Sequence, residues 1–255
     1  MKKIPSFLTV FLLLCVGCVA NNVTEDDPVI IHDSAFFFRD SKFLYAGSFS
    51  SVDPYNFEYR INGSGIPASE YLLAFSPKDE TVEVPDFDVS TYQEPLIFWF
   101  RDHHTGLEDY SVYREYLSQL KEFLFDVKAP TIRQGRIELR TEEIESIKIT
   151  SNCVLFGRAP GEDLTDRFEL YRTLGHTNYP PFYFTSDKTL VTSGIQGKSL
   201  DKFISERPLI PAMTFLRLKE TPSEAPVDVT FTVSISLKDK AALTATAAPV
   251  MILRN

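Results

Sequence analysis

The chain has 255 residues, of which 44% are hydrophobic and 13% aromatic, and its formal net charge is −9. This composition supports a sizeable hydrophobic core and excludes a disordered, collagen-like or disulfide-framework protein. The 35 acidic residues outnumber the 26 basic ones, so no nucleic-acid partner is expected, and the glycines form no phosphate-binding loop.

The N-terminus has the pattern of a secretory signal peptide over residues 1–17. Lys2 and Lys3 provide a basic start, and Phe7 to Val16 is an uncharged apolar run of the length of a signal-peptide core. A membrane span over residues 4–20 is the alternative interpretation. We favour the signal peptide, because a span needs ~20 apolar residues and this stretch is interrupted by polar ones.

A cysteine motif follows the apolar run. The sequence Cys15-Val16-Gly17-Cys18 resembles the lipobox of bacterial lipoproteins, in which a small residue precedes the lipid-carrying cysteine. The resemblance implies cleavage after Gly17 and acylation of Cys18, with palmitate among the attached acyl chains. It departs from the usual pattern at Cys15, where leucine is common. A plain secretory signal cut near Ala20 is the alternative.

An acidic tether is expected over residues 18–28, which are polar and show no periodicity. Removal of residues 1–17 takes two lysines and no acids, and therefore leaves 24 basic and 35 acidic residues, a net charge of −11. An anionic membrane repels such a chain, so attachment must come from the acyl chains. Cys153 is then the remaining unmodified cysteine, which excludes an intramolecular disulfide.

Residues 29–255 are predicted to form a β-rich domain. Apolar residues alternate with polar ones from Val227 to Leu237, which indicates a strand with one buried face. The turn residues Lys238-Asp239-Lys240 and a second alternating run from Leu243 predict a β-hairpin, which Pro249 interrupts. The run from Leu96 to Phe100 is apolar on both faces and predicts a central strand. Further strands are predicted at Phe36–Phe38, Phe43–Phe49, Phe57–Ile61, Tyr71–Phe75, Thr81–Val84, Leu96–Arg101, Ile137–Arg140, Ser146–Thr150, Pro181–Thr185 and Thr214–Leu218.

One amphipathic helix is predicted near residues 109–125, because Tyr113, Leu117, Leu120 and Leu124 are spaced three or four apart. A shorter helix over Leu200–Ser205 is a second candidate, and Leu164–Leu170 is ambiguous. The predicted fold class is all-β, mainly an antiparallel β-sandwich, immunoglobulin-like or related. We expect a single domain over residues 29–255, with a division near residue 129 as the alternative.

Few residue patterns point to chemistry. His103 and His104 lie in a loop with three carboxylates and are weak candidates for a metal site, because adjacent residues on an extended chain point to opposite sides. Asp33-Ser34-Ala35 resembles the O-glycosylation acceptor of exported Bacteroides-type proteins, which makes Ser34 a candidate for modification. We expect no catalytic residue and no cofactor. The tyrosines near turns that a sugar-binding surface could use are Tyr55, Tyr59, Tyr92, Tyr179 and Tyr183.

The lipobox-like Cys18, the acidic tether and the threonine- and valine-rich C-terminal hairpin together resemble the outer-membrane lipoproteins of Bacteroides-type bacteria. The resemblance implies a protein anchored in the outer membrane, on its periplasmic side or at the cell surface. The expected function is a non-catalytic binding or structural module whose partner is a glycan or another envelope protein. The alternatives are a glycan-binding accessory lipoprotein and a metal-dependent hydrolase that uses the His103/His104 loop.

Overall fold

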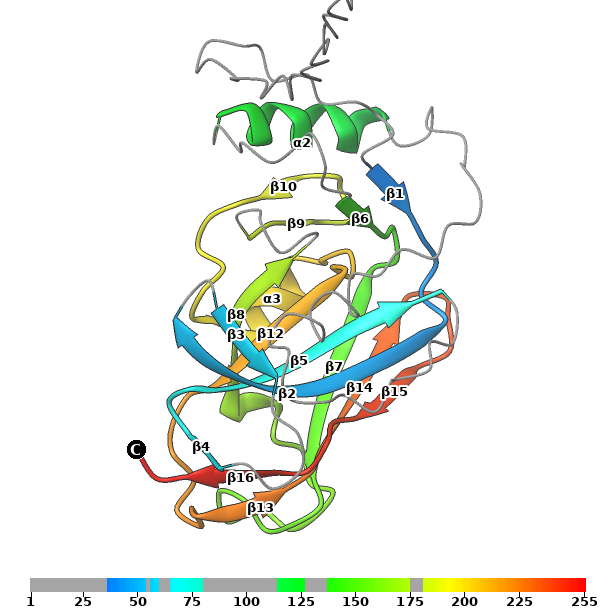
Figure 1. Ribbon diagram of the computed structural model, residues 1–255. Helices are drawn as coiled ribbons and strands as arrows, with labels where there is room; N and C mark the ends of the chain where they lie inside the picture. The colour runs from blue at the N-terminus through cyan, green and yellow to red at the C-terminus, as the bar shows by residue number, and fades with distance from the viewer. Residues whose placement is uncertain (1–35, 54–55, 60–64, 80–113, 127–136, 175–180) are drawn as a thin grey trace, which may run out of the picture.

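The computed structural model describes residues 36–53, 56–59, 65–79, 114–126, 137–174 and 181–255 (Figure 1). In these ranges the chain is mainly β-strands, with helices α2 (Arg114–Asp126) and α3 (Leu200–Ser205). The predicted all-β fold class is therefore confirmed. Helix α2 lies at one end of the molecule, and β4, β13 and β16 lie at the other (Figure 1).

The largest sheet has six strands in the order β11-β8-β12-β5-β2-β3, and all neighbouring pairs are antiparallel. Every residue of β5 is buried, so β5 is a central strand covered on both faces. The strands of this sheet are β2 (Phe43–Asp53), β3 (Asn56–Tyr59), β5 (Tyr71–Lys78), β8 (Phe168–Leu174), β11 (Lys198–Ser199) and β12 (Met213–Leu218).

The remaining strands form smaller sheets. One antiparallel sheet has the order β15-β14-β7, with β7 (Ile144–Ser151), β14 (Phe231–Leu237) and β15 (Leu243–Thr246). Another has the order β13-β16-β4, with β4 (Gly65–Pro67), β13 (Val227–Val229) and β16 (Val250–Leu253). The two-stranded pairs are β1 (Phe36–Phe38) with β6 (Ile137–Leu139), and β9 (Tyr183–Phe184) with β10 (Leu190–Val191).

The hydrophobic core lies between the six-stranded sheet and the sheet that contains β14. Phe231 of β14 is fully buried, and its ring lies 5.5 Å from Tyr71 of β5 and 5.4 Å from Phe168 of β8, measured between ring centroids. Burial alternates along β14 as the sequence pattern predicts, with the Thr and Ser residues on the outer side. Aromatic packing between the two sheets therefore closes the sandwich.

The second face of the six-stranded sheet is also buried. Leu72 and Ala74 alternate with the core-facing residues of β5 and have no exposed surface. Phe49 of β2 packs on this face against Phe215 of β12, with ring centroids 5.4 Å apart. A strand buried on both sides loses the apolar–polar alternation of a half-exposed strand, which explains the continuous apolar run of β5.

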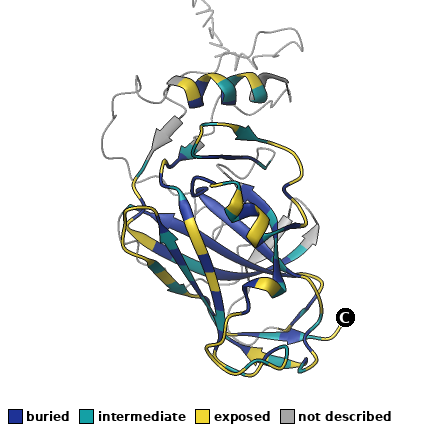
Figure 2. Cartoon of the chain, turned by 180° about the vertical axis from the view of Figure 1, so that it is seen from behind, coloured by how far each residue is buried: buried dark blue, intermediate teal, exposed yellow. Residues whose placement is uncertain are grey.

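Helix α2 packs on the β9–β10 hairpin. Tyr116 stacks edge-on against Phe184, with ring centroids 5.1 Å apart. The side-chain amide of Gln119 donates to the Lys188 carbonyl at 2.8 Å and accepts from the Leu190 N–H at 3.2 Å. Buried and exposed residues alternate along the helix (Figure 2), as the predicted amphipathic pattern requires. The predicted helix is confirmed over its described part, and the short helix at Leu200–Ser205 is also present as α3.

The structure corrects the single strand predicted from Val227 to Leu237. It is divided at Thr230 into β13 and β14. The N–H of Thr230 donates to Asn152 Oδ1 at 2.8 Å, and its carbonyl accepts from the Asn152 N–H at 3.1 Å. These bonds replace ladder bonds, so β13 pairs with β16 while β14 pairs with β7 and β15.

Two further predictions concern turns and ambiguous segments. The hairpin between β14 and β15 has the predicted turn, and β16 begins directly after Pro249, as the missing N–H of proline suggested. The ambiguous segment Leu164–Leu170 is a 3₁₀ turn over Thr165–Arg167 followed by β8. The strands predicted at Thr81–Val84 and Leu96–Arg101 lie outside the described residues.

Candidate functional site

The sites predicted from sequence lie outside the described part of the chain. This holds for the lipidation candidate Cys18, the glycosylation candidate Ser34 and the metal candidates His103 and His104. Within the described ranges, no group of three or more His, Cys, Asp or Glu side chains is placed to bind a metal ion. The lipidation, glycosylation and metal sites therefore remain predictions from the sequence.

The tyrosines proposed for a sugar-binding surface receive one correction. Tyr183 is only 2% exposed, because β9 turns its ring inward against Phe203, with ring centroids 5.1 Å apart. The prediction that Tyr183 belongs to an exposed aromatic surface was therefore wrong. Tyr59 lies in β3. The other candidates, Tyr55, Tyr92 and Tyr179, lie outside the described residues.

Tyr183 instead takes part in a buried polar cluster with Lys198 and Glu206. The Lys198 amine lies 2.5 Å from the Tyr183 hydroxyl and 2.6 Å from a Glu206 oxygen, to which the hydroxyl also donates. Burial and the bond to Glu206 raise the pKa of Tyr183. Burial alone would raise the pKa of Glu206, but its bonds to Lys198 and Tyr183 outweigh this and lower the pKa. A hydroxyl held protonated in this way positions α3 and is unsuited to proton transfer near neutral pH.

Two other carboxylates hold loops in place. Glu224 accepts hydrogen bonds from the backbone N–H groups of Phe156 at 3.0 Å and Gly157 at 2.8 Å. Glu142 accepts from the Ser41 N–H at 2.7 Å and from the Lys240 amine at 2.8 Å, which attaches the β14–β15 turn to the segment after β1. In both cases an acidic side chain satisfies buried or turn N–H groups, which is a structural role.

A polar groove lies on the surface of the described part of the chain. It lies where β8 and β12 meet the segment after β4 and the C-terminus, and it encloses about 460 Å³ when the open space above it is included. The residues that line it are Ala68, Ser69, Glu169, Arg217, Leu218, Lys219, Glu220, Thr221 and Asn255. We call this feature the polar groove.

Hydrogen bonds between distant segments hold the polar groove in shape. Arg217 donates through Nε to Glu169 at 3.1 Å, and its guanidinium lies over the ring of Tyr171 at 5.6 Å from the centroid. The side chain of Asn255 accepts from the Ser69 N–H and donates to the Thr221 hydroxyl, both at 2.8 Å. The groove therefore presents carboxylate, guanidinium, amide and hydroxyl groups on a fixed frame.

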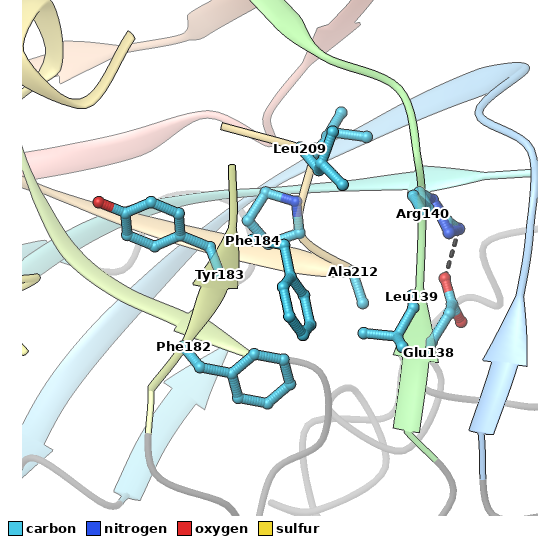
Figure 3. A pocket seen from close by; sticks show the side chains of 10 residues that line it. Glu138, Leu139, Arg140, Phe182, Tyr183, Phe184, Leu209 and Ala212 are labelled. Atoms are coloured by element: carbon cyan, nitrogen blue, oxygen red, sulfur yellow. Dashed lines mark ion pairs between the residues drawn. The ribbon is translucent and has the colours of Figure 1, made fainter. Parts of the chain in front are cut away.

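A second, smaller cavity lies between β6, β9 and the segment before β12. Figure 3 shows the Glu138–Arg140 pair on one side of this cavity and Phe182 and Phe184 on the other. The cavity has a volume of about 20 Å³, which is enough for about one water molecule.

Charged side chains are buried next to this cavity. Arg140 is fully buried, donates to the Pro77 carbonyl at 2.7 Å and pairs with Glu138. Arg39 pairs with Asp79 at 3.0 Å, and its Nε lies 3.9 Å from Glu138. Burial, the largest effect, lowers the pKa of the neighbouring Lys78 to about 8. We call Arg39, Lys78, Asp79, Glu138 and Arg140 the buried charge cluster.

Cys153 is a small side chain at the edge of the hydrophobic core. Cys153 is half-buried, packs against the core and forms no disulfide with another described residue. Burial and the nearby carboxylates of Glu224 and Asp228 raise the pKa of its thiol. A raised pKa disfavours the thiolate, which is the reactive form.

No known protein family, curated protein or solved structure gives a significant match to this chain. In the described ranges, neither helix combines the length and the apolar character that crossing a bilayer requires.

Proposed function

We propose that the protein is a non-catalytic, lipid-anchored module of a bacterial outer membrane that binds a polar partner through the polar groove. The groove is the observation that supports binding, because it is open and presents hydrogen-bonding groups from several segments. The anchoring is supported by the resemblance of Cys15-Val16-Gly17-Cys18 to a lipobox.

The proposal of a non-catalytic role is supported by the structural contacts of three described carboxylates. Glu206, Glu224 and Glu142 each accept hydrogen bonds that fix a helix or a loop. A general acid or base must instead reach a substrate and exchange protons near the working pH. The contacts favour a rigid framework for binding.

Anchoring can be tested in whole cells of a bacterial host that processes lipoproteins. We expect the wild-type chain to be recovered in the outer-membrane fraction and Cys18→Ser to be released from it. Cys153→Ser is the matched control, because it removes a thiol from the folded body and leaves the lipobox intact. Equal membrane recovery of wild type and Cys18→Ser would contradict the anchor.

The glycan-binding alternative is favoured by the chemistry of the polar groove. Carboxylate, guanidinium and amide groups hydrogen-bond well to sugar hydroxyls, and Glu169, Arg217 and Asn255 supply these groups at the groove. A glycan array probed with the detergent-purified protein tests this alternative. Binding that Arg217→Ala abolishes and Arg254→Ala retains would support it, whereas an array with no retained sugar would exclude it.

The metal-dependent hydrolase alternative depends on His103 and His104, which lie outside the described residues. Metal analysis of the purified protein tests it. A stoichiometric zinc or other divalent ion that is lost in a His103→Ala/His104→Ala double variant would favour the enzyme over the binding module.

A further inference from the structure

We infer that the polar groove binds an uncharged saccharide, and that Glu169 and Arg217 recognise two neighbouring hydroxyl groups of one sugar ring. The inference rests on the proposed binding through the polar groove and names the chemistry of the ligand. The placement of the two side chains, the pairing of the charges around them and the size of the groove each support it.

Glu169 and Arg217 lie side by side on one face of the six-stranded sheet. Glu169 of β8 is the direct partner of Arg217 of β12 in the antiparallel register, and opposite residues in such a pair have their side chains on the same face. Both side chains line the polar groove, and they are 18% and 34% exposed respectively. A ligand in the groove can therefore reach both.

The ion pair leaves a hydrogen-bond acceptor and a donor available. Nε and Nη2 of Arg217 both donate to Oε1 of Glu169. Oε2 of Glu169 and Nη1 of Arg217 have no hydrogen-bond partner among the described residues. A hydroxyl group can donate one hydrogen bond and accept others. One sugar hydroxyl can therefore donate to the carboxylate while its neighbour accepts from the guanidinium.

Contacts within the protein fix the polar groups that line the groove. The guanidinium of Arg217 lies over the ring of Tyr171, 5.6 Å from the centroid. The side chain of Asn255 joins the Ser69 N–H to the Thr221 hydroxyl, with both hydrogen bonds at 2.8 Å. Side chains that are already fixed lose little conformational freedom when a ligand binds. The groove is therefore preorganised for a ligand that bears hydroxyl groups.

The charges that line the groove favour an uncharged ligand. Arg217 pairs with Glu169, and Glu220 pairs with Arg167 at 2.5 Å. The amine of Lys219 donates to a backbone carbonyl at 2.8 Å. A carboxylate ligand would have to take Arg217 from Glu169, and this would leave a half-buried carboxylate without its partner. Sugar hydroxyls can bind to the pair without breaking it.

The size of the groove suits a small saccharide. It encloses about 460 Å³ when the open space above it is included, which lies within the range of ~300–1,000 Å³ that is typical of small-ligand sites. Because one side of the groove is open, a longer chain can extend beyond it. We therefore expect the groove to hold a small saccharide or the end of a longer one.

A glycan array probed with the full-length protein in detergent tests the inference. The array carries neutral oligosaccharides of glucose, galactose and mannose, the same oligosaccharides with hexuronic acids in place of the hexoses, and neutral copies treated with periodate and then with borohydride. Periodate cleaves the bond between carbons that bear neighbouring hydroxyl groups. We expect the protein to retain neutral sugars, to bind the matched hexuronic acids about tenfold more weakly, and to lose binding after periodate.

A change of selectivity locates the site. Glu169→Gln removes the carboxylate and frees the guanidinium of Arg217, so it should weaken neutral-sugar binding about tenfold and strengthen binding of the hexuronic acids. Glu143→Gln is the matched control, because Glu143 is 14% exposed and pairs with Arg207 at 2.8 Å outside the groove. It should keep the selectivity of the wild type. The periodate result on the wild type tests the inference even where Glu169→Gln fails to fold.

The possible outcomes distinguish this inference from the proposed function. Neutral-sugar binding that Arg217→Ala leaves unchanged would place the binding site outside the groove and contradict both. Tighter binding of hexuronic acids than of neutral sugars, or binding that survives periodate, would overturn the inference; loss of that binding in Arg217→Ala would keep the groove as the binding site. An array with no retained sugar would also overturn the inference and leave the groove to a polar partner of another class.

Discussion

The sandwich core and the buried charge cluster are both shielded from water, but they are held together by different forces. In the core, Phe231 packs against Tyr71 and Phe168 from the opposite sheet, and apolar surface is removed from water. In the cluster, the ionic side chain of Arg140 is buried and that of Glu138 is only 13% exposed, so their desolvation must be offset by pairing. Core packing tolerates changes of pH and salt, whereas the cluster should respond to both.

The largest effect is expected in the core. Phe231→Ala should lower the free energy of unfolding by about 4 kcal/mol, because it removes a fully buried ring and leaves a cavity between the sheets. Urea unfolding followed by circular dichroism measures the change. The matched control is Thr232→Ala on the outer face of β14, expected to cost less than about 0.5 kcal/mol. Similar losses for both variants would contradict the assigned core.

The next effect is expected in the buried charge cluster. Glu138→Gln should lower the free energy of unfolding by about 3 kcal/mol, because it leaves the buried Arg140 without its carboxylate partner. Urea unfolding followed by circular dichroism measures the loss. A loss below about 0.5 kcal/mol, typical of an exposed ion pair, would show that the pair is not buried.

The pH dependence of stability separates the two regions further. The pKa of Lys78 is about 8 in the folded protein against 10.5 for an ordinary lysine, so between these values the unfolded chain binds more protons. Stability should therefore rise with pH in this window, by about 1.5 kcal/mol between pH 8 and 9.5 from Lys78 alone.

The comparison of wild type with Lys78→Met isolates this contribution. The other titrating groups, including Cys153, are common to both proteins and cancel in the difference. Parallel stability curves for the two proteins from pH 8 to 9.5 would show that Lys78 titrates as an ordinary lysine.

A smaller effect is expected where α2 docks on the β9–β10 hairpin. Gln119→Ala removes the bonds to Lys188 and Leu190 and should cost about 1 kcal/mol. Hydrogen exchange at the Leu190 amide should increase more than exchange in β14, since docking is local. Lys121→Ala, a change on the same helix, is the control. Unchanged exchange at Leu190 would contradict this docking.

Elements that depend on a local pattern could be predicted from the sequence, whereas contacts between distant segments could not. β14 was predicted because its buried residues recur at every second position, and α2 because its apolar residues recur three and four apart. The division at Thr230 was missed because its cause, Asn152, lies in another segment. No local pattern could join Arg39, Lys78 and Arg140, since the fold brings them together from distant positions.

The candidate sites also differ in whether neighbouring residues or distant segments form them. Short motifs indicate Cys18, Ser34 and the His103/His104 loop as candidate sites. No sequence pattern predicts the polar groove, because the spacing of Ser69, Glu169, Arg217 and Asn255 along the chain does not mark a site. Tyr183 was misassigned because proximity to a turn does not determine which way a strand residue points.

The proposal of a lipid-anchored envelope module rests on the chemistry of Cys18, and mass spectrometry of the protein purified from its membrane tests it most directly. The expected N-terminal peptide begins at Cys18 and carries fatty acyl groups. A processed chain that begins at another residue and bears no fatty acid would contradict the proposed anchor.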